Sequence, residues 1–173
     1  MNPTQTKQLT LDLMGQHNLL PHWSFKFDST RTRFGQCRHH IQEIGISRYL
    51  SAMNQTPEVK DVILHEIAHA LVGPNHGHDS EWQAKAVSIG ASPNKYYDSE
   101  TVKLANLYDF SCPKCAFKYR ANRMPPKNRR YVCRHDLTPL ILDNDPQEQA
   151  IKQFMLTHGC SREKAEQALT GDF

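Results

Sequence analysis

The chain has 173 residues, with 21 Lys or Arg and 18 Asp or Glu side chains that give a formal net charge of +3. This length suits one domain, or one core with small modules attached. No uncharged apolar run approaches the roughly 18 residues that a membrane span needs. The first residues also lack the basic and apolar pattern of a secretory signal. We therefore exclude a membrane protein and expect an intracellular, cytoplasmic protein without a membrane partner.

The positive charge is concentrated in one segment of the chain. Residues 101–135 contain nine basic side chains and one acidic side chain, whereas residues 1–100 and 136–173 both carry a net negative charge. A local excess of eight positive charges is typical of a surface that binds polyanions. This segment is therefore the candidate nucleic-acid interface.

Hydrophobic spacing predicts a helix followed by three strands in the first third of the chain. Leucines recur at helical intervals over residues 1–18, and the pattern then predicts strands near 23–27, 36–40 and 41–46. We expect these strands to form a small antiparallel sheet. Gly35 and Gly45 indicate bulges or close approaches of the backbone to a neighbour.

The clearest helix of the chain follows this sheet. Thr56 is a suitable N-cap and Pro57 suits the first helical position, while Gly73 marks the end. Apolar residues recur between these points at the spacing of a buried helix face. A further helix, capped by Asp79 or Ser80, is predicted to run to about residue 89.

The strongest helix contains the sequence His65-Glu66-Ile67-Ala68-His69. Histidines four positions apart project from the same helix face, so these two can share one Zn²⁺. Glu66, beside the metal, can hold and deprotonate a bound water. The metzincin motif HExxHxxGxxH would need a glycine and a histidine one residue before Gly73 and His76, so it does not fit this sequence. The third ligand therefore stays open between His76 and His78.

A second metal-binding pattern lies in the basic segment. Cys112, Cys115 and Cys133 have the spacing of three zinc-ribbon ligands. We expect His135, the chemically better zinc donor, as the fourth ligand. Asp136 is the second choice, because it stands where the spacing of the first cysteine pair would place the second cysteine of the other pair. The remaining alternative is that the module has lost its metal and is stabilised by its aromatic residues.

Basic and aromatic residues alternate along the same module. Cations neutralise phosphates, and rings such as those of Tyr119 and Tyr131 stack on exposed bases. We therefore expect DNA binding that does not depend on base sequence. The candidate residues are Lys114, Lys118, Arg120, Arg123, Lys127, Arg129 and Arg130.

The segment HEIAHALVGPNHGHDSEW, residues 65–82, resembles the SprT-like metallopeptidase family, which includes Spartan-type DNA–protein crosslink proteases. That family has HExxH, a short variable loop, and then His-x-x-Glu-aromatic. The resemblance implies that His65, His69 and His78 are the zinc ligands and that Glu66 is the catalytic acid/base. Glu81 and Trp82 complete the second motif.

The resemblance extends over roughly residues 5–142, because Gly35-Gln-Cys37 and the strands around it are similar to the N-terminal sheet of the family. The sequence departs from the family in two places. Asp79 stands where a glycine often follows the third histidine, which keeps His76 open as a ligand. Cys133-Arg-His-Asp136 stands where family members commonly have the second cysteine pair of a four-cysteine ribbon.

These features predict an α+β fold of three parts. Residues 1–108 form a SprT-like, zincin-like helical core with the small sheet, residues 109–142 form a zinc-ribbon-like basic module, and residues 143–173 form a linker and a helical pair. The pair, near 147–157 and 161–170, faintly resembles a ubiquitin-associated fold. It is too short for three helices, so we expect a docking tail.

The resulting hypothesis is a zinc-dependent endopeptidase that cleaves DNA-bound or DNA-crosslinked proteins, with one catalytic and one structural Zn²⁺. Glu66 activates the water in this hypothesis, and the basic module tethers the enzyme to DNA. Two alternatives stay open: a non-proteolytic nucleic-acid-binding protein whose HExxH zinc is structural, and a hydrolase of small amides that does not need DNA.

Overall fold

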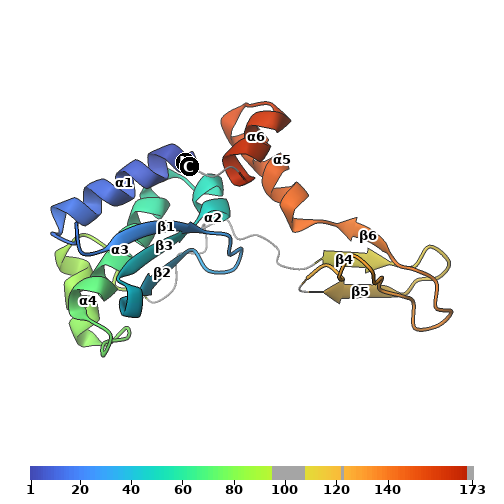
Figure 1. Cartoon of the computed structure of the whole chain (residues 1–173), viewed down its shortest axis with the longest axis horizontal. Coiled ribbons are helices and arrows are strands. Elements are labelled where there is room, and N and C mark those ends of the chain that lie inside the picture. The colour runs from blue at the N-terminus through green and yellow to red at the C-terminus, as the bar shows by residue number, and fades with distance from the viewer. Residues whose placement is uncertain (95–107, 122, 171–173) are drawn as a thin grey trace.

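The computed structural model describes residues 1–94, 108–121 and 123–170 (Figure 1). The N-terminal part consists of α1 (Pro3–Gln16), β1 (Ser24–Asp28), β2 (Gly35–Arg38), the 3₁₀ turn η1 (His39–Ile41), β3 (Glu43–Ser47), α2 (Arg48–Met53), α3 (Thr56–Val72) and α4 (Ser80–Ser88). The C-terminal part consists of β4 (Tyr108–Ser111), β5 (Lys118–Ala121), β6 (Ile141–Asn144), α5 (Pro146–His158) and α6 (Arg162–Thr170). The described chain is therefore a mixed α+β fold.

The N-terminal sheet has the strand order β1-β3-β2 and is mixed, so the prediction of a purely antiparallel sheet is wrong. Strand β3 is antiparallel to β2 but parallel to β1. Ile44 and Ile46 of β3 are fully buried, which favours the central position for this strand. The chain therefore crosses from β1 to the far edge, forms β2 there, and returns between the two as β3.

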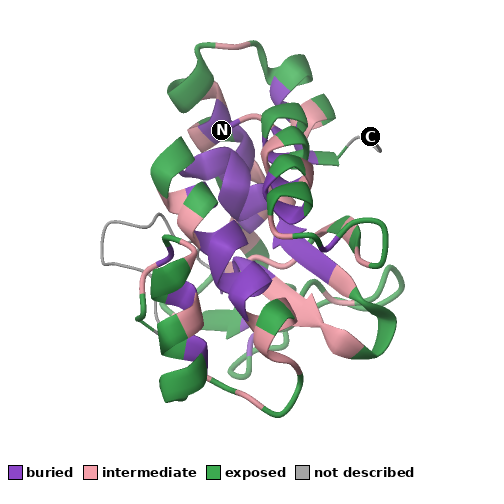
Figure 2. Cartoon of the chain, turned by 90° about the vertical axis from the view of Figure 1, so that its left-hand side faces the viewer, coloured by how far each residue is buried: buried purple, intermediate pink, exposed green. Residues whose placement is uncertain are grey.

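Helix α3 is the central element of the N-terminal core. Val59, Ile63 and Ile67 on this helix have no exposed surface, and the helix contacts α1, α4, β2 and β3. Figure 2 shows the buried residues gathered in the middle of this part of the molecule and the exposed residues on the outer helix faces. The helix begins one residue earlier than predicted, with Gln55 as N-cap, and ends at Gly73.

The C-terminal helical pair packs on this same core. Helices α5 and α6 contact α2, and Ile151, Phe154 and Leu169 are buried together with the N-terminal residues. The Nε2 atom of His158 lies 3.1 Å from the carbonyl oxygen of Ala52. The short helix α2, which the sequence did not predict, therefore provides the surface on which the pair rests.

The second sheet has the order β5-β4-β6 and is antiparallel throughout. Outside these strands, Val132 and Pro139 form an isolated antiparallel bridge. Only Asp145 separates the end of β6 from the start of α5. Among the described residues, no helix is both long enough and apolar enough to cross a lipid bilayer.

Candidate metal centre

Three histidine side chains converge between α3 and the start of α4. His65 and His69 lie one turn apart on α3, and His78 lies two residues before α4. The Nε2 atom of His78 is 3.0 Å from Nε2 of His65 and 3.2 Å from Nε2 of His69. Nitrogen ligands of a tetrahedral zinc, at about 2.0–2.1 Å from the ion, are about 3.3 Å apart. The spacing of these three nitrogens is therefore compatible with zinc.

Burial keeps the helical histidines of this cluster neutral. The pKa of His65, which is 6% exposed, is lowered to about 3 by burial and further by the charges of His69 and His78. Burial and the charge of His78 lower the pKa of His69 to about 4. Because a neutral imidazole is the form that binds a metal, the cluster is ready for a cation at neutral pH.

A short loop and a helix cap bring His78 to the other two histidines. Gly73 ends α3 with a φ of 92°, a conformation that favours glycine. The side chain of Asp79 caps α4 by accepting a hydrogen bond from the backbone N–H of Trp82 at 3.0 Å. The Nε2 atom of Gln83 donates to the carbonyl oxygen of His78 at 3.2 Å. Residues on α4 therefore fix the third histidine at the helix N-terminus.

The indole ring of Trp82 packs against the histidine cluster. Its side chain is fully buried, and its ring centroid lies 4.6 Å from those of His65 and His78 and 5.1 Å from that of His69. One indole thus contacts all three imidazoles. Rings that are held in this way lose little further freedom when a metal binds.

His76 lies apart from this cluster. Its Nδ1 atom is 2.9 Å from a carboxylate oxygen of Asp79, and its Nε2 atom is 3.5 Å from one of Glu81. The hydrogen bond to Asp79 raises the pKa of His76. Both ring nitrogens thus face carboxylates, and the structure groups His78, rather than His76, with the two helical histidines.

The side chain of Glu66, a residue of α3, lies against the edge strand β2. The side chain is buried, with 5% exposed, and it lies against the backbone of Gly35. Burial, and then the negative charge of Glu66, raise the pKa of the Cys37 thiol to about 12. The sequence indicated a close backbone approach at Gly35 without its partner. The missing signal is the pairing of β2 at the sheet edge beside α3, which no local pattern encodes.

The three cysteines of the second pattern also come together. The Sγ atoms of Cys112, Cys115 and Cys133 all lie within 4.8 Å of one another, and those of Cys115 and Cys133 are 3.6 Å apart. Thiolates around a tetrahedral zinc, at about 2.3 Å from the ion, are about 3.8 Å apart. This group is therefore also compatible with zinc.

Both candidates for the fourth ligand lie next to this group. The Nδ1 atom of His135 is 3.6 Å from Sγ of Cys115. Asp136 lies three residues after Cys133, and its Oδ1 atom accepts a hydrogen bond from the backbone N–H of Thr138 at 3.0 Å. Neither joins the three sulfurs in the cluster itself, so His135 stays the first choice for the fourth ligand and Asp136 the second.

All seven predicted DNA-binding cations are exposed on this module. Arg120 forms an ion pair of 2.6 Å with Asp109; in the described part of the chain, no ion pair with a carboxylate is found for the other six, which are Lys114, Lys118, Arg123, Lys127, Arg129 and Arg130. Tyr119 is 40% exposed, and its ring centroid lies 4.9 Å from that of Tyr131. The module therefore presents both exposed cations and an aromatic pair.

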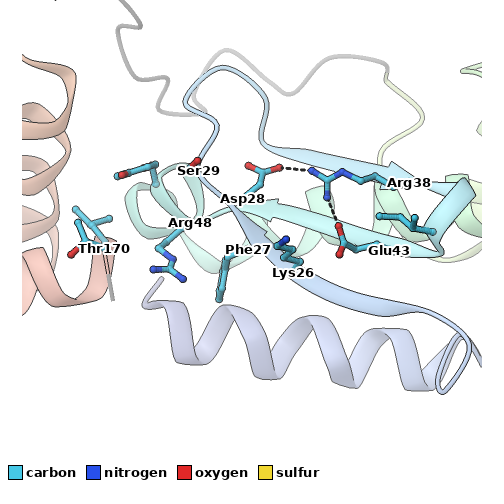
Figure 3. Close-up of a pocket in the computed structure, with 11 residues that line it drawn as sticks. Lys26, Phe27, Asp28, Ser29, Arg38, Glu43, Arg48 and Thr170 are labelled. Atoms are coloured by element: carbon cyan, nitrogen blue, oxygen red, sulfur yellow. Dashed lines mark hydrogen bonds and ion pairs between the residues drawn. The ribbon is translucent and has the colours of Figure 1, made fainter. Parts of the chain in front are cut away.

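A separate cavity of about 720 Å³ lies beside the sheet and the end of α6 (Figure 3). Arg38 crosses it between two acids, with its guanidinium 2.7 Å from Glu43 and 3.5 Å from Asp28. Lys26 and Arg48 complete the charged lining. None of the predicted site residues lines this cavity, so its size does not mark the candidate metal centre.

Comparison with known proteins places the N-terminal part of the chain, including the three histidines, in a family. The sequence model of the SprT-like family matches residues 5–103, which is more than half of the chain. Proteins named Protein SprT from Pseudomonas savastanoi pv. phaseolicola and Pseudomonas syringae pv. syringae are each 25% identical over 122 residues, a match that covers 64% of this chain and 74% of the relative. No solved structure gave a significant match. The chain therefore belongs to the SprT-like family.

Proposed function

We propose that this chain is a zinc-dependent endopeptidase with a zincin-like core. The observation that carries the proposal is the convergence of His65, His69 and His78, with the buried Glu66 next to His65 on α3. A zinc ion bound there would polarise a peptide carbonyl and acidify a water. The donor set suits this chemistry, because three imidazoles leave a tetrahedral zinc one open position.

The side chains of the cluster have separate roles in this proposal. The three imidazoles hold the metal, and Trp82 keeps their rings in place. A carboxylate oxygen of Glu66 accepts the proton of the attacking water and then gives it to the nitrogen of the leaving amine. Since Glu66 is buried and directly follows His65 on α3, its carboxylate needs little reorganisation before it acts.

The proposed substrates are proteins bound or crosslinked to DNA. The support for this part is the cysteine module, which carries exposed cations and the Tyr119–Tyr131 pair. Phosphates and stacked bases are recognised by this combination, and neither contact depends on base sequence. In this proposal the second zinc stabilises the module, and DNA brings the substrate to the enzyme.

Metal analysis of four proteins tests the two sites. We expect about two zinc ions per chain in the wild type, and one in both His78→Ala and Cys112→Ser. His76→Ala is the matched control and should keep both. A His78→Ala protein with its full zinc content would refute the ligand assignment, and a wild type with one zinc would remove the structural role of metal in the basic module.

An activity assay then tests the chemistry. Cleavage of a DNA-binding protein should depend on DNA and on low salt, and Glu66→Gln should keep its zinc while losing activity by about 10²- to 10⁴-fold. If Glu66→Gln leaves every measured activity unchanged, the chain is a non-proteolytic binding protein with a structural zinc. Turnover of small amides that is indifferent to DNA would instead favour the small-amide hydrolase.

A further inference from the structure

The edge strand β2 is held firmly at the point where it passes Glu66. Gly35, its first residue, pairs with Ile46 of the central strand. The preceding residue, Phe34, is buried with 2% exposed, and its carbonyl oxygen accepts a hydrogen bond from the backbone N–H of Ser47 at 2.7 Å. The strand therefore has packing and backbone bonds on both sides of Gly35, which resist an outward shift.

The side chain of Glu66 fills the space that a side chain at position 35 would need. A Cβ atom built on Gly35 would lie 2.6 Å from Oε1, 2.7 Å from Cγ and 2.9 Å from Cδ of Glu66. Real Cβ atoms essentially never approach other heavy atoms so closely. The overlap includes Cγ and not only the tip of the side chain, so rotation about the last bond alone does not relieve it.

The backbone conformation does not explain the glycine. The φ of Gly35 is outside the left-handed region, so other residues can adopt it. Glu66 is also confined from its own side, because Ile63 and Ile67 of α3 have no exposed surface and fix the helix in the core. A methyl group on β2 would therefore displace the Glu66 carboxylate rather than either backbone.

We infer that Gly35 is a positioning residue for Glu66, because the missing side chain on β2 creates the recess that holds the carboxylate beside the histidine cluster. This inference rests on the proposed peptidase function. Gly35 touches neither the substrate nor the metal ligands in this role. It acts through the geometry of the general base, where a displacement of about 1 Å lowers the rate by roughly 10²-fold.

The test compares Gly35→Ala with Gly45→Ala in the zinc-loaded full chain. A Cβ atom at Gly45 would approach as closely, 2.6 Å, but to Nη1 of Arg38, whose ion-pair partners Glu43 and Asp28 are outside the candidate metal centre. We expect both variants to keep their zinc. Gly35→Ala should lower kcat by about 10- to 100-fold with little change in KM, whereas Gly45→Ala should stay within about threefold of the wild type.

The Glu66→Ala background separates positioning from a general structural effect. Alanine has no Cγ atom and leaves room for the methyl group, so Gly35→Ala should lower the kcat that remains there by less than about threefold. An equal loss in both backgrounds, a wild-type kcat for Gly35→Ala, or loss of zinc from this variant would overturn the inference.

Thermal unfolding gives a readout that does not need activity. Gly35→Ala should lower Tm by about 3 to 8 °C in the wild-type background, and by much less in the Glu66→Ala background. An inactive wild type would refute the proposed function alone. Equal Tm shifts in the two backgrounds would refute the role of Gly35 alone.

Discussion

Replacement of Trp82 tests whether one indole supports the three histidines. Trp82 is fully buried, contacts all three imidazole rings, and its Nε1 atom has no hydrogen-bond partner among the described residues. Trp82→Ala removes the ring that packs against the cluster. Trp82→Phe keeps an aromatic ring and removes the unpaired N–H group.

The two substitutions should differ strongly in the free energy of unfolding. Truncation of a buried aromatic residue to alanine costs about 3–5 kcal/mol through lost burial and the cavity that remains. For Trp82→Phe, the loss of ring volume costs about 1–2 kcal/mol. This loss is offset by about 1–3 kcal/mol, because a buried N–H group without a partner is removed. We therefore expect Trp82→Phe within about 1 kcal/mol of the wild type.

Urea unfolding of the zinc-free proteins measures these values, and calorimetric titration with zinc measures the effect on the metal. Zinc affinity should fall by about 10- to 100-fold in Trp82→Ala and much less in Trp82→Phe. A Trp82→Phe protein as unstable as Trp82→Ala would refute the reasoning, since it would mean that the indole N–H stabilises the fold. Unchanged zinc affinity in Trp82→Ala would show that the histidines are positioned without the indole.

Three further predictions concern pH, DNA and the C-terminal helices. In the folded chain the pKa of His65 is about 3 and that of His69 about 4, whereas both histidines titrate near 6.5 when the chain is unfolded. The stability of the zinc-free chain should therefore fall as the pH drops below 6.5, by up to about 1.4 kcal/mol per pH unit for each of the two histidines. Equal urea midpoints at pH 7 and pH 5 would contradict this. Arg129→Ala with Arg130→Ala should weaken DNA binding and reduce the slope of log affinity against log salt by about 1.4 to 1.8, which fluorescence anisotropy over a salt series measures. Phe154→Ala should cost about 3–5 kcal/mol in urea unfolding, whereas Arg162→Ala, which removes exposed ion pairs, should change stability little.

Local signals made most of the helices predictable. Asp79, Gly73 and the apolar spacing between residues 56 and 72 are short-range features, and the structure has helix boundaries within one or two residues of those predicted. The helical pair at the C-terminus follows for the same reason. Helix caps and hydrophobic periodicity depend on residues only a few positions apart, so they can be recognised in a single sequence.

Three features could not be predicted from the sequence because they depend on contacts between residues that are distant in the chain. The parallel pairing of β1 with β3 depends on which strand takes the buried centre of the sheet. Helix α2 has six residues, too few for a periodic pattern, and five of them are buried by neighbours distant in sequence. His76 and His78 follow His69 at similar spacings in the sequence, and only the folded loop distinguishes them. His78 lies within 3.2 Å of both helical histidines, whereas His76 faces two carboxylates.

The packing of α5 and α6 on α2 makes the cysteine module an insertion within the core rather than an appendage at its end. A chain shortened after residue 144 would lose the buried side chains of Ile151, Phe154 and Leu169 from the core, so removal of the C-terminal helices should destabilise the histidine-bearing part as well. The single residue Asp145 between β6 and α5 is also a short connection. In the proposed function, DNA on the module would be held by a short link to the core and not by a long flexible tether, which restricts how far along the DNA one bound enzyme can reach.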